Sequence, residues 1–185
     1  VGAESGDKVW VVPQTEQVGV PWLGWNTQAP SLVDAADRGV TMEFLGHSGP
    51  GDFSLFLQNG GFEAPQLLWS TAQKSDEDFW VDLNTHTHAN WVFTDPGVHL
   101  VGVRAVVKDN AGQVHTAEEV VRLAVGEGTD VNAAFERDFA PADPSAGGVD
   151  SKLIAIITAV AVVVIVAVLA AVAALRSRSR SGRQS

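Results

Sequence analysis

An uncharged run near the end of the chain constrains its organisation more than any other feature. It extends from Leu153 to Leu175 and, apart from Thr158, contains only Leu, Ile, Val and Ala. As a helix rising ~1.5 Å per residue it would measure about 34 Å, and the hydrocarbon core of a bilayer is ~30 Å thick. The alternative is a buried helix of a soluble domain, which seldom runs this long without a charge. The run therefore predicts a transmembrane helix.

The residues on either side of this run predict its orientation. Several arginines follow it in the tail 176–185, whereas Lys152 is the basic residue directly before it. Basic residues concentrate on the cytoplasmic side of membrane helices. We therefore expect a single-pass protein of the cell membrane, with a basic cytoplasmic tail and an extracellular N-terminal domain. Small-xxx-small pairs such as Ala155/Ala159 leave a homo-oligomer open.

The charge of the expected extracellular part excludes some partners. Residues 1–152 hold all 22 acidic residues and eight of the 12 basic ones, so their net charge is −14. This balance argues against binding nucleic acid or anionic lipid, and it favours cationic partners or metal ions. The chain has no Cys, which excludes disulfides and thiolate metal sites. Its stability must come from a packed core.

The part before the anchor divides into three segments. Residues 1–7 are polar, which predicts a disordered start, and 127–152 are rich in Gly, Pro, Ala and Asp, which predicts a flexible stalk. The folded domain is expected over 8–126. The chain opens on Val1 without a basic and apolar leader. Because an outward-facing N-terminus needs a translocation signal, we expect that a leader or a longer N-terminal segment has been removed.

Alternation of apolar and polar residues predicts the fold class of 8–126. Val40, Met42 and Phe44, for example, share one face of an extended segment, and Gly-rich turns such as 59–61 separate the segments. The expected strands are 8–12, 40–44, 53–57, 66–70, 79–83, 86–93, 98–108 and 114–125. No convincing amphipathic helix lies between them. The pattern indicates an all-β domain, an antiparallel β-sandwich of immunoglobulin-like type.

One of these strands carries the most unusual chemistry. Side chains alternate along a strand, so His86, His88 and Asn90 share one face, while Trp91 and Phe93 share the other and form the expected core face. Two His at i and i+2 are suited to bind one first-row metal ion. The alternative is that they hydrogen-bond within a half-exposed sheet. A metal would need another ligand, and the candidates are His47, Asp82, His99 and His115.

Tryptophans suggest a second class of function. Trp22 and Trp25 lie in the loop after the first expected strand, where they form either a lid on the core or a displayed binding surface. With Trp80 they could stack on carbohydrate. This predicts, as the alternative to metal binding, a non-catalytic adhesion module that binds glycan or another part of the envelope. A structural spacer without a ligand is the third hypothesis.

Motifs for catalysis are weak. The run Gly46-His47-Ser48-Gly49-Pro50 has Pro where the serine-hydrolase elbow G-x-S-x-G needs its last Gly. The Gly clusters sit at strand turns without a following helix, so they do not predict a phosphate-binding loop. The acidic run 76–78 is interpreted as a solvated charge cluster, with a calcium site as the alternative. We expect a protein that is not an enzyme.

Three stretches resemble a known family when they are taken in order. They are KVWVVPQTEQVGVPWLGWNTQ, GPGDFSLF and HTHANWVFTDPGVH. Together they resemble the actinobacterial surface-anchored repeat domain, also called the choice-of-anchor M domain. Two departures accompany the resemblance. The family's N-terminal segment with a Gly-His-x-Asp motif is not found before Asp7, and His99 replaces the usual aromatic after the PGV turn.

The resemblance implies a role in metal acquisition. Such domains occur on surface proteins encoded beside ABC transporters of the manganese and zinc uptake type. It implies zinc or manganese as the bound ion, and components of an ABC transporter or its substrate-binding protein as partners. The motif histidines fall on His86 and His88, the motif Asn on Asn90 and the aromatic on Trp91.

Overall fold

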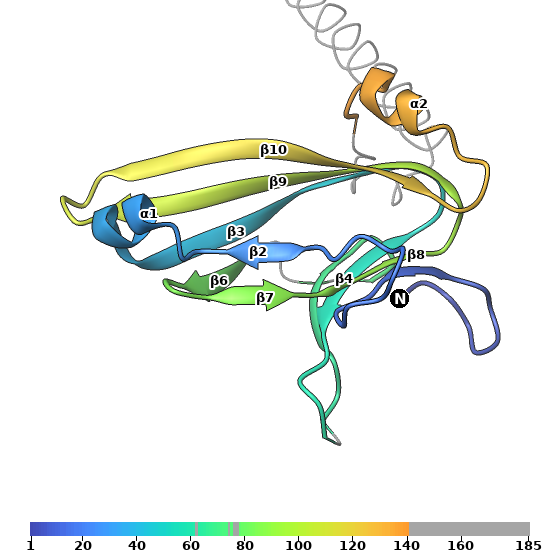
Figure 1. The fold of residues 1–185 in the computed structure, drawn as a ribbon, viewed down its shortest axis with the longest axis horizontal. Helices are drawn as coiled ribbons and strands as arrows, with labels where there is room; N and C mark the ends of the chain where they lie inside the picture. The colour runs from blue at the N-terminus through green and yellow to red at the C-terminus, as the bar shows by residue number, and fades with distance from the viewer. Residues whose placement is uncertain (62, 74, 76–77, 141–185) are drawn as a thin grey trace, which may run out of the picture. The chain divides into compact units, whose positions relative to one another are not determined.

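A computed structural model describes residues 1–61, 63–73, 75 and 78–140 of the protein (Figure 1). The predicted transmembrane helix from Leu153 to Leu175, the basic tail and the second half of the predicted stalk lie outside the described residues. Among the residues that are described, no helix has both the length and the apolar character needed to cross a membrane.

The described residues form ten strands and two short helices. The strands are β1 (Trp10–Val12), β2 (Gly24–Asn26), β3 (Ala36–Ser48), β4 (Phe53–Leu57), β5 (Gln66–Ser70), β6 (Asp78–Asp82), β7 (His86–His88), β8 (Asn90–Phe93), β9 (Gly97–Asp109) and β10 (Val114–Val125). The helices are α1 (Pro30–Ala35) and α2 (Val131–Glu136).

Three antiparallel sheets are built from these strands. One has the order β1-β8-β4-β5, a second has the order β10-β9-β3-β6, and β2 pairs with β7 in a two-stranded ribbon. We call them the β8 sheet, the β9 sheet and the β2–β7 ribbon. Figure 1 shows the long strands β3, β9 and β10 lying side by side, with the ribbon in front of β3 and β6. The prediction of an all-β fold of antiparallel sheets is confirmed.

The expected His strand is divided between two sheets. His86 to His88 form β7 in the ribbon, whereas Asn90 to Phe93 form β8 in the β8 sheet. The break falls at Ala89, which is fully buried and whose backbone N–H donates to the Leu23 carbonyl. The division therefore places the His pair on a small ribbon beside the sandwich. The partner strand β2 was not predicted, because only three residues of the Trp-bearing loop are extended.

The pairing does not follow the order of the chain. In the β8 sheet the first strand β1 lies beside β8, and in the β9 sheet β3 lies between β9 and β6.

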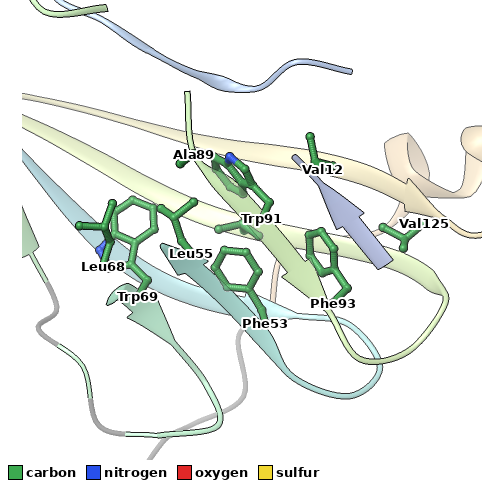
Figure 2. Close-up of a cluster of buried hydrophobic side chains, with 10 residues drawn as sticks. Val12, Phe53, Leu55, Leu68, Trp69, Ala89, Trp91, Phe93 and Val125 are labelled. Carbon is green, nitrogen blue, oxygen red and sulfur yellow. The ribbon is translucent and has the colours of Figure 1, made fainter. Parts of the chain in front are cut away.

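An aromatic core joins the two larger sheets. Phe53 on β4 and Phe93 on β8 are fully buried, and Figure 2 shows them beside Leu55 and Trp91. Phe44 of the β9 sheet packs on Phe53, with ring centroids 5.9 Å apart. The expected core face of the His strand is thereby confirmed for Trp91 and Phe93. Burying one such side chain contributes about 2–3 kcal/mol, so this layer stabilises a fold that has no disulfides.

The folded part extends beyond the expected boundary at 126. The Arg122 side chain on β10 donates to the carbonyl oxygens of Ala134 and Arg137, at 2.7 and 2.8 Å. Phe139 lies directly over Gly102 of β9, where a Cβ would collide with its ring. The described first half of the predicted stalk thus packs on the β9 sheet.

Candidate functional site

The β2–β7 ribbon positions the two histidines of the sequence motif. Its register places Gly24 opposite His88 and Asn26 opposite His86. A Cβ at Gly24 would collide with the Thr87 carbonyl, so glycine lets the two strands approach. Buried Thr27 closes the end of the ribbon: its hydroxyl donates to the Asp82 carbonyl at 2.7 Å and accepts from the Thr85 N–H at 3.0 Å.

His86 and His88 point toward each other at the ring nitrogens that are most distant from the backbone. Their Nε2 atoms are 3.1 Å apart, and the ring planes meet at 42°. The His86 side chain is exposed and that of His88 is half-buried. The shared face expected from the i, i+2 spacing is therefore observed. The two nitrogens are hydrogen-bonded to each other, which was the alternative to a metal site, and the same convergence is what two ligands of one ion need.

Trp22 covers one face of the pair. Its ring stacks on His88 with centroids 3.7 Å apart and an interplanar angle of 7°. The indole N–H donates to the Gln14 carbonyl at 2.9 Å, and the Gln14 N–H donates to Asn90 Oδ1 at 3.0 Å. Asn90 thus holds the loop that carries Trp22 in place. Trp22 remains 46% exposed, so it is a partial lid on the His88 ring.

Asn26 contacts His86 and was not singled out in the sequence. Its Nδ2 lies 3.2 Å from His86 Nδ1, and its Oδ1 accepts from the Gln28 backbone N–H at 2.7 Å. No sequence signal marks this contact, because it depends on the register of β2 against β7. The two ring nitrogens of His86 therefore have different partners: Nδ1 faces the Asn26 amide and Nε2 faces His88.

The other predicted ligands have partners elsewhere. His47 Nε2 lies 2.9 Å from His99 Nδ1, and His115 Nε2 lies 2.9 Å from Asp109 Oδ2. The Asp82 carboxylate accepts from the Trp80 indole at 2.8 Å. Within the described parts of the chain, no group of three or more His, Asp or Glu side chains is arranged to hold a metal ion. The structure therefore brings His86 and His88 together without these candidates.

His47 and His99 form a second pair, which is buried between the sheets. His47 is 5% exposed and His99 is fully buried. His99 Nε2 donates to the Asp95 carbonyl at 3.0 Å, so its Nδ1 accepts from His47 Nε2. Burial, and after it the nearby His99, lower the pKa of His47 from 6.5 to about 4. Burial also lowers the pKa of His99, although the hydrogen bond to Asp95 opposes the effect.

Both histidines of this second pair are thus neutral near pH 7. Gly49 lies directly against them, since a Cβ at this residue would be 2.7 Å from His99 Nδ1 and 2.8 Å from His47 Nε2. The Gly49 backbone thus packs directly against the hydrogen-bonded nitrogens. It is a structural hydrogen bond between β3 and β9.

The three tryptophans expected to bind glycan do not form one surface. Trp25 packs into the core against Phe79, with ring centroids 5.0 Å apart. Trp80 follows Phe79 on β6 and therefore points to the opposite face, where it is 51% exposed. Its ring covers Gly39, whose Cα has no side chain to occupy that space. Trp22 is engaged with His88.

Comparison with protein-family models, with curated proteins and with solved structures found no match.

Proposed function

We propose that this chain is a membrane-anchored cell-surface protein whose β-sandwich binds a divalent metal ion, zinc or manganese, between His86 and His88, and that it serves an ABC importer. The transmembrane anchor and the extracellular placement rest on the apolar run 153–175 and its basic flank. The importer rests on the resemblance of the motif around His86. The finer fold assignment, an immunoglobulin-like sandwich followed by one membrane helix, belongs to the same proposal.

One observation supports the metal ion most directly. The Nε2 atoms of His86 and His88 are 3.1 Å apart. Two imidazole nitrogens that each lie ~2.0–2.1 Å from a tetrahedral ion are ~3.3–3.4 Å from each other. A small rotation of the two side chains would bring the nitrogens to this spacing. The neighbouring chain holds this arrangement, because Trp22 stacks on His88 and the Asn26 amide contacts His86.

Imidazole ligands favour zinc over manganese, because manganese prefers carboxylate, carbonyl and water oxygens. Two protein ligands leave other coordination positions of a zinc ion to water or to a donor from another molecule. Such an open site on an exposed ribbon is suited to pass an ion on rather than to store it. The net charge of −14 before the membrane segment attracts cations toward it.

The proposal is tested by titrating zinc and manganese into the full chain in detergent, with isothermal calorimetry as the readout. We expect zinc to bind with one-to-one stoichiometry and at least micromolar affinity, and manganese to bind more weakly. The His86→Ala/His88→Ala double variant should lose zinc binding by a factor of at least 100, because both designated ligands are gone.

His115→Ala is the matched control. It removes another exposed histidine, one that is hydrogen-bonded to Asp109, and should bind zinc as the wild type does. Zinc binding that persists in the folded double variant would contradict the proposal. Absence of zinc binding in the wild type would favour a non-catalytic adhesion, envelope-binding or glycan-binding module, or a spacer.

A further inference from the structure

Three hydrogen bonds run in series through the His86 and His88 pair. The first is from the Gln28 backbone N–H to Asn26 Oδ1, at 2.7 Å. A backbone N–H can only donate, so this contact identifies the oxygen of the Asn26 amide. The amide nitrogen then faces His86 Nδ1, at 3.2 Å. Since an amide NH₂ can only donate, His86 Nδ1 must accept.

The protons of both imidazoles follow from this direction. A neutral imidazole carries one N–H, and in His86 it must be on Nε2 because Nδ1 accepts. His86 Nε2 therefore donates to His88 Nε2 across the 3.1 Å contact. His88 in turn carries its proton on Nδ1. That nitrogen is buried, and no hydrogen-bond partner is found for it in the described part of the chain.

In this arrangement only one of the two histidines, His88, has a lone pair at Nε2. A metal ligand must present a lone pair, and in His88 the lone pair of Nε2 already faces the partner ring. His86 presents an N–H at the same place. For His86 to become a ligand through Nε2, its proton must move to Nδ1, where it would face the N–H groups of Asn26. The Asn26 amide must then turn over and release the Gln28 N–H.

We infer that Asn26 is a positioning residue of the His pair: it holds His86 and His88 hydrogen-bonded to each other, and a divalent cation binds both rings only when its amide turns over. The cation part of this inference rests on the proposed function. A ligating histidine is usually oriented by an acceptor at its other nitrogen, and Asn26 presents a donor there instead. The arrangement in which His86 and His88 are hydrogen-bonded to each other is thus favoured until an ion replaces that hydrogen bond.

The substitution Asn26→Asp would remove the need for a side-chain amide to turn over. In Asn26→Asp one carboxylate oxygen can accept from the Gln28 N–H while the other accepts from His86 Nδ1. Both histidines would then present lone pairs at Nε2 without any rotation at residue 26. Outer partners of metal ligands change affinity by a factor of ~10–100. We expect Asn26→Asp to bind zinc about tenfold more tightly than the wild type, at constant pH.

The first experiment needs no metal. Long-range ¹H–¹⁵N correlation spectra of the metal-free full chain in detergent report the tautomer of each histidine. We expect His86 as the Nε2–H form and His88 as the Nδ1–H form, and we expect His86 to become the Nδ1–H form in Asn26→Asp. An Nδ1–H form of His86 in the wild type, or an unchanged tautomer in Asn26→Asp, would overturn the inference.

The second experiment is zinc calorimetry on the wild type, Asn26→Asp, and Asn26→Asp combined with His86→Ala. The combined variant separates tautomer control from the added negative charge, because charge alone would still strengthen residual binding without His86. Asn26→Ala is the second variant, should aspartate disturb the ribbon. It removes the opposing donor and should strengthen binding by a smaller factor.

The outcomes distinguish the two proposals. Tighter binding in Asn26→Asp that disappears with His86→Ala would support both. Equal zinc affinity in the wild type and in both Asn26 variants, with dependence on His86 retained, would overturn the role of Asn26 and leave the zinc site. Absence of zinc binding in the wild type and in Asn26→Asp alike would overturn the zinc site and the cation part of the inference together.

Discussion

Single histidines differ in this protein according to what surrounds them. His86 is exposed and its ring meets a second ring at the surface, whereas His47 is buried among Phe53, Phe93 and His99. Both pairs have nitrogens about as close as a hydrogen bond allows. The buried pair has the Gly49 backbone packed directly against its nitrogens, whereas the His86 side chain of the other pair is exposed to solvent.

The buried pair should make stability depend on pH. The pKa of His47 is lowered from 6.5 to about 4 in the folded state, chiefly by burial. The unfolded chain therefore takes up a proton first as the pH falls, so the stabilisation is complete above about pH 6.5 and is lost between there and pH 4. This difference in pKa between the unfolded and the folded state corresponds to about 3 kcal/mol in the free energy of unfolding. The lowered pKa of His99 acts in the same direction.

Urea unfolding of the full chain at several pH values between 4 and 8 checks this prediction. His47→Gln should flatten the dependence, whereas Thr116→Val should leave it unchanged, because Thr116 is exposed on β10 and has no titratable side chain. A wild-type free energy of unfolding that is constant from pH 7 to pH 4.5 would show that the buried pair is not neutral in the folded state.

At the scale of elements, the candidate site lies on the smallest of the three sheets, the β2–β7 ribbon. Its strands have three residues each and pair only with each other. The Thr27 hydroxyl connects the ribbon to the end of β6. The Trp22 indole and the Asn90 side chain both bond to the backbone of Gln14, in the loop that follows β1. A site built on so short an element depends on these few contacts for its geometry.

Thr27→Val tests that dependence. The substitution keeps the shape of the side chain and leaves the Thr85 N–H without its acceptor, which costs ~1–3 kcal/mol. We expect faster amide hydrogen exchange across the ribbon and weaker zinc binding, with little change in β9 and β10. Thr116→Val is the control, because Thr116 is exposed on β10. Equal exchange rates in both variants would contradict the role of Thr27.

At the scale of the whole molecule, one aromatic layer holds the two larger sheets together. Phe53 lies within 6 Å of four other rings, which belong to Phe44, His47, Trp91 and Phe93. Two of these side chains come from β3 and two from β8. The sheets therefore have a common core and should unfold together.

Phe53→Ala should lower the free energy of unfolding by about 3–5 kcal/mol, because it leaves a cavity between the sheets. Val114→Ala, at a residue that is 61% exposed, should change it by less than ~0.5 kcal/mol. Urea denaturation followed by tryptophan fluorescence and by circular dichroism measures both. Two separate transitions in Phe53→Ala would show that the sheets have independent cores.

The sequence by itself determined the fold class, most strand positions, the core face of Trp91 and Phe93, and the shared face of His86 and His88. These properties follow from alternation and turn chemistry, which are local. Only the tertiary structure decided that the His strand divides at Ala89, that β2 pairs with β7, that His47 meets His99, and that Asn26 faces His86. Those contacts join residues 52 to 64 positions apart, and their register depends on how whole sheets pack, which no local pattern records.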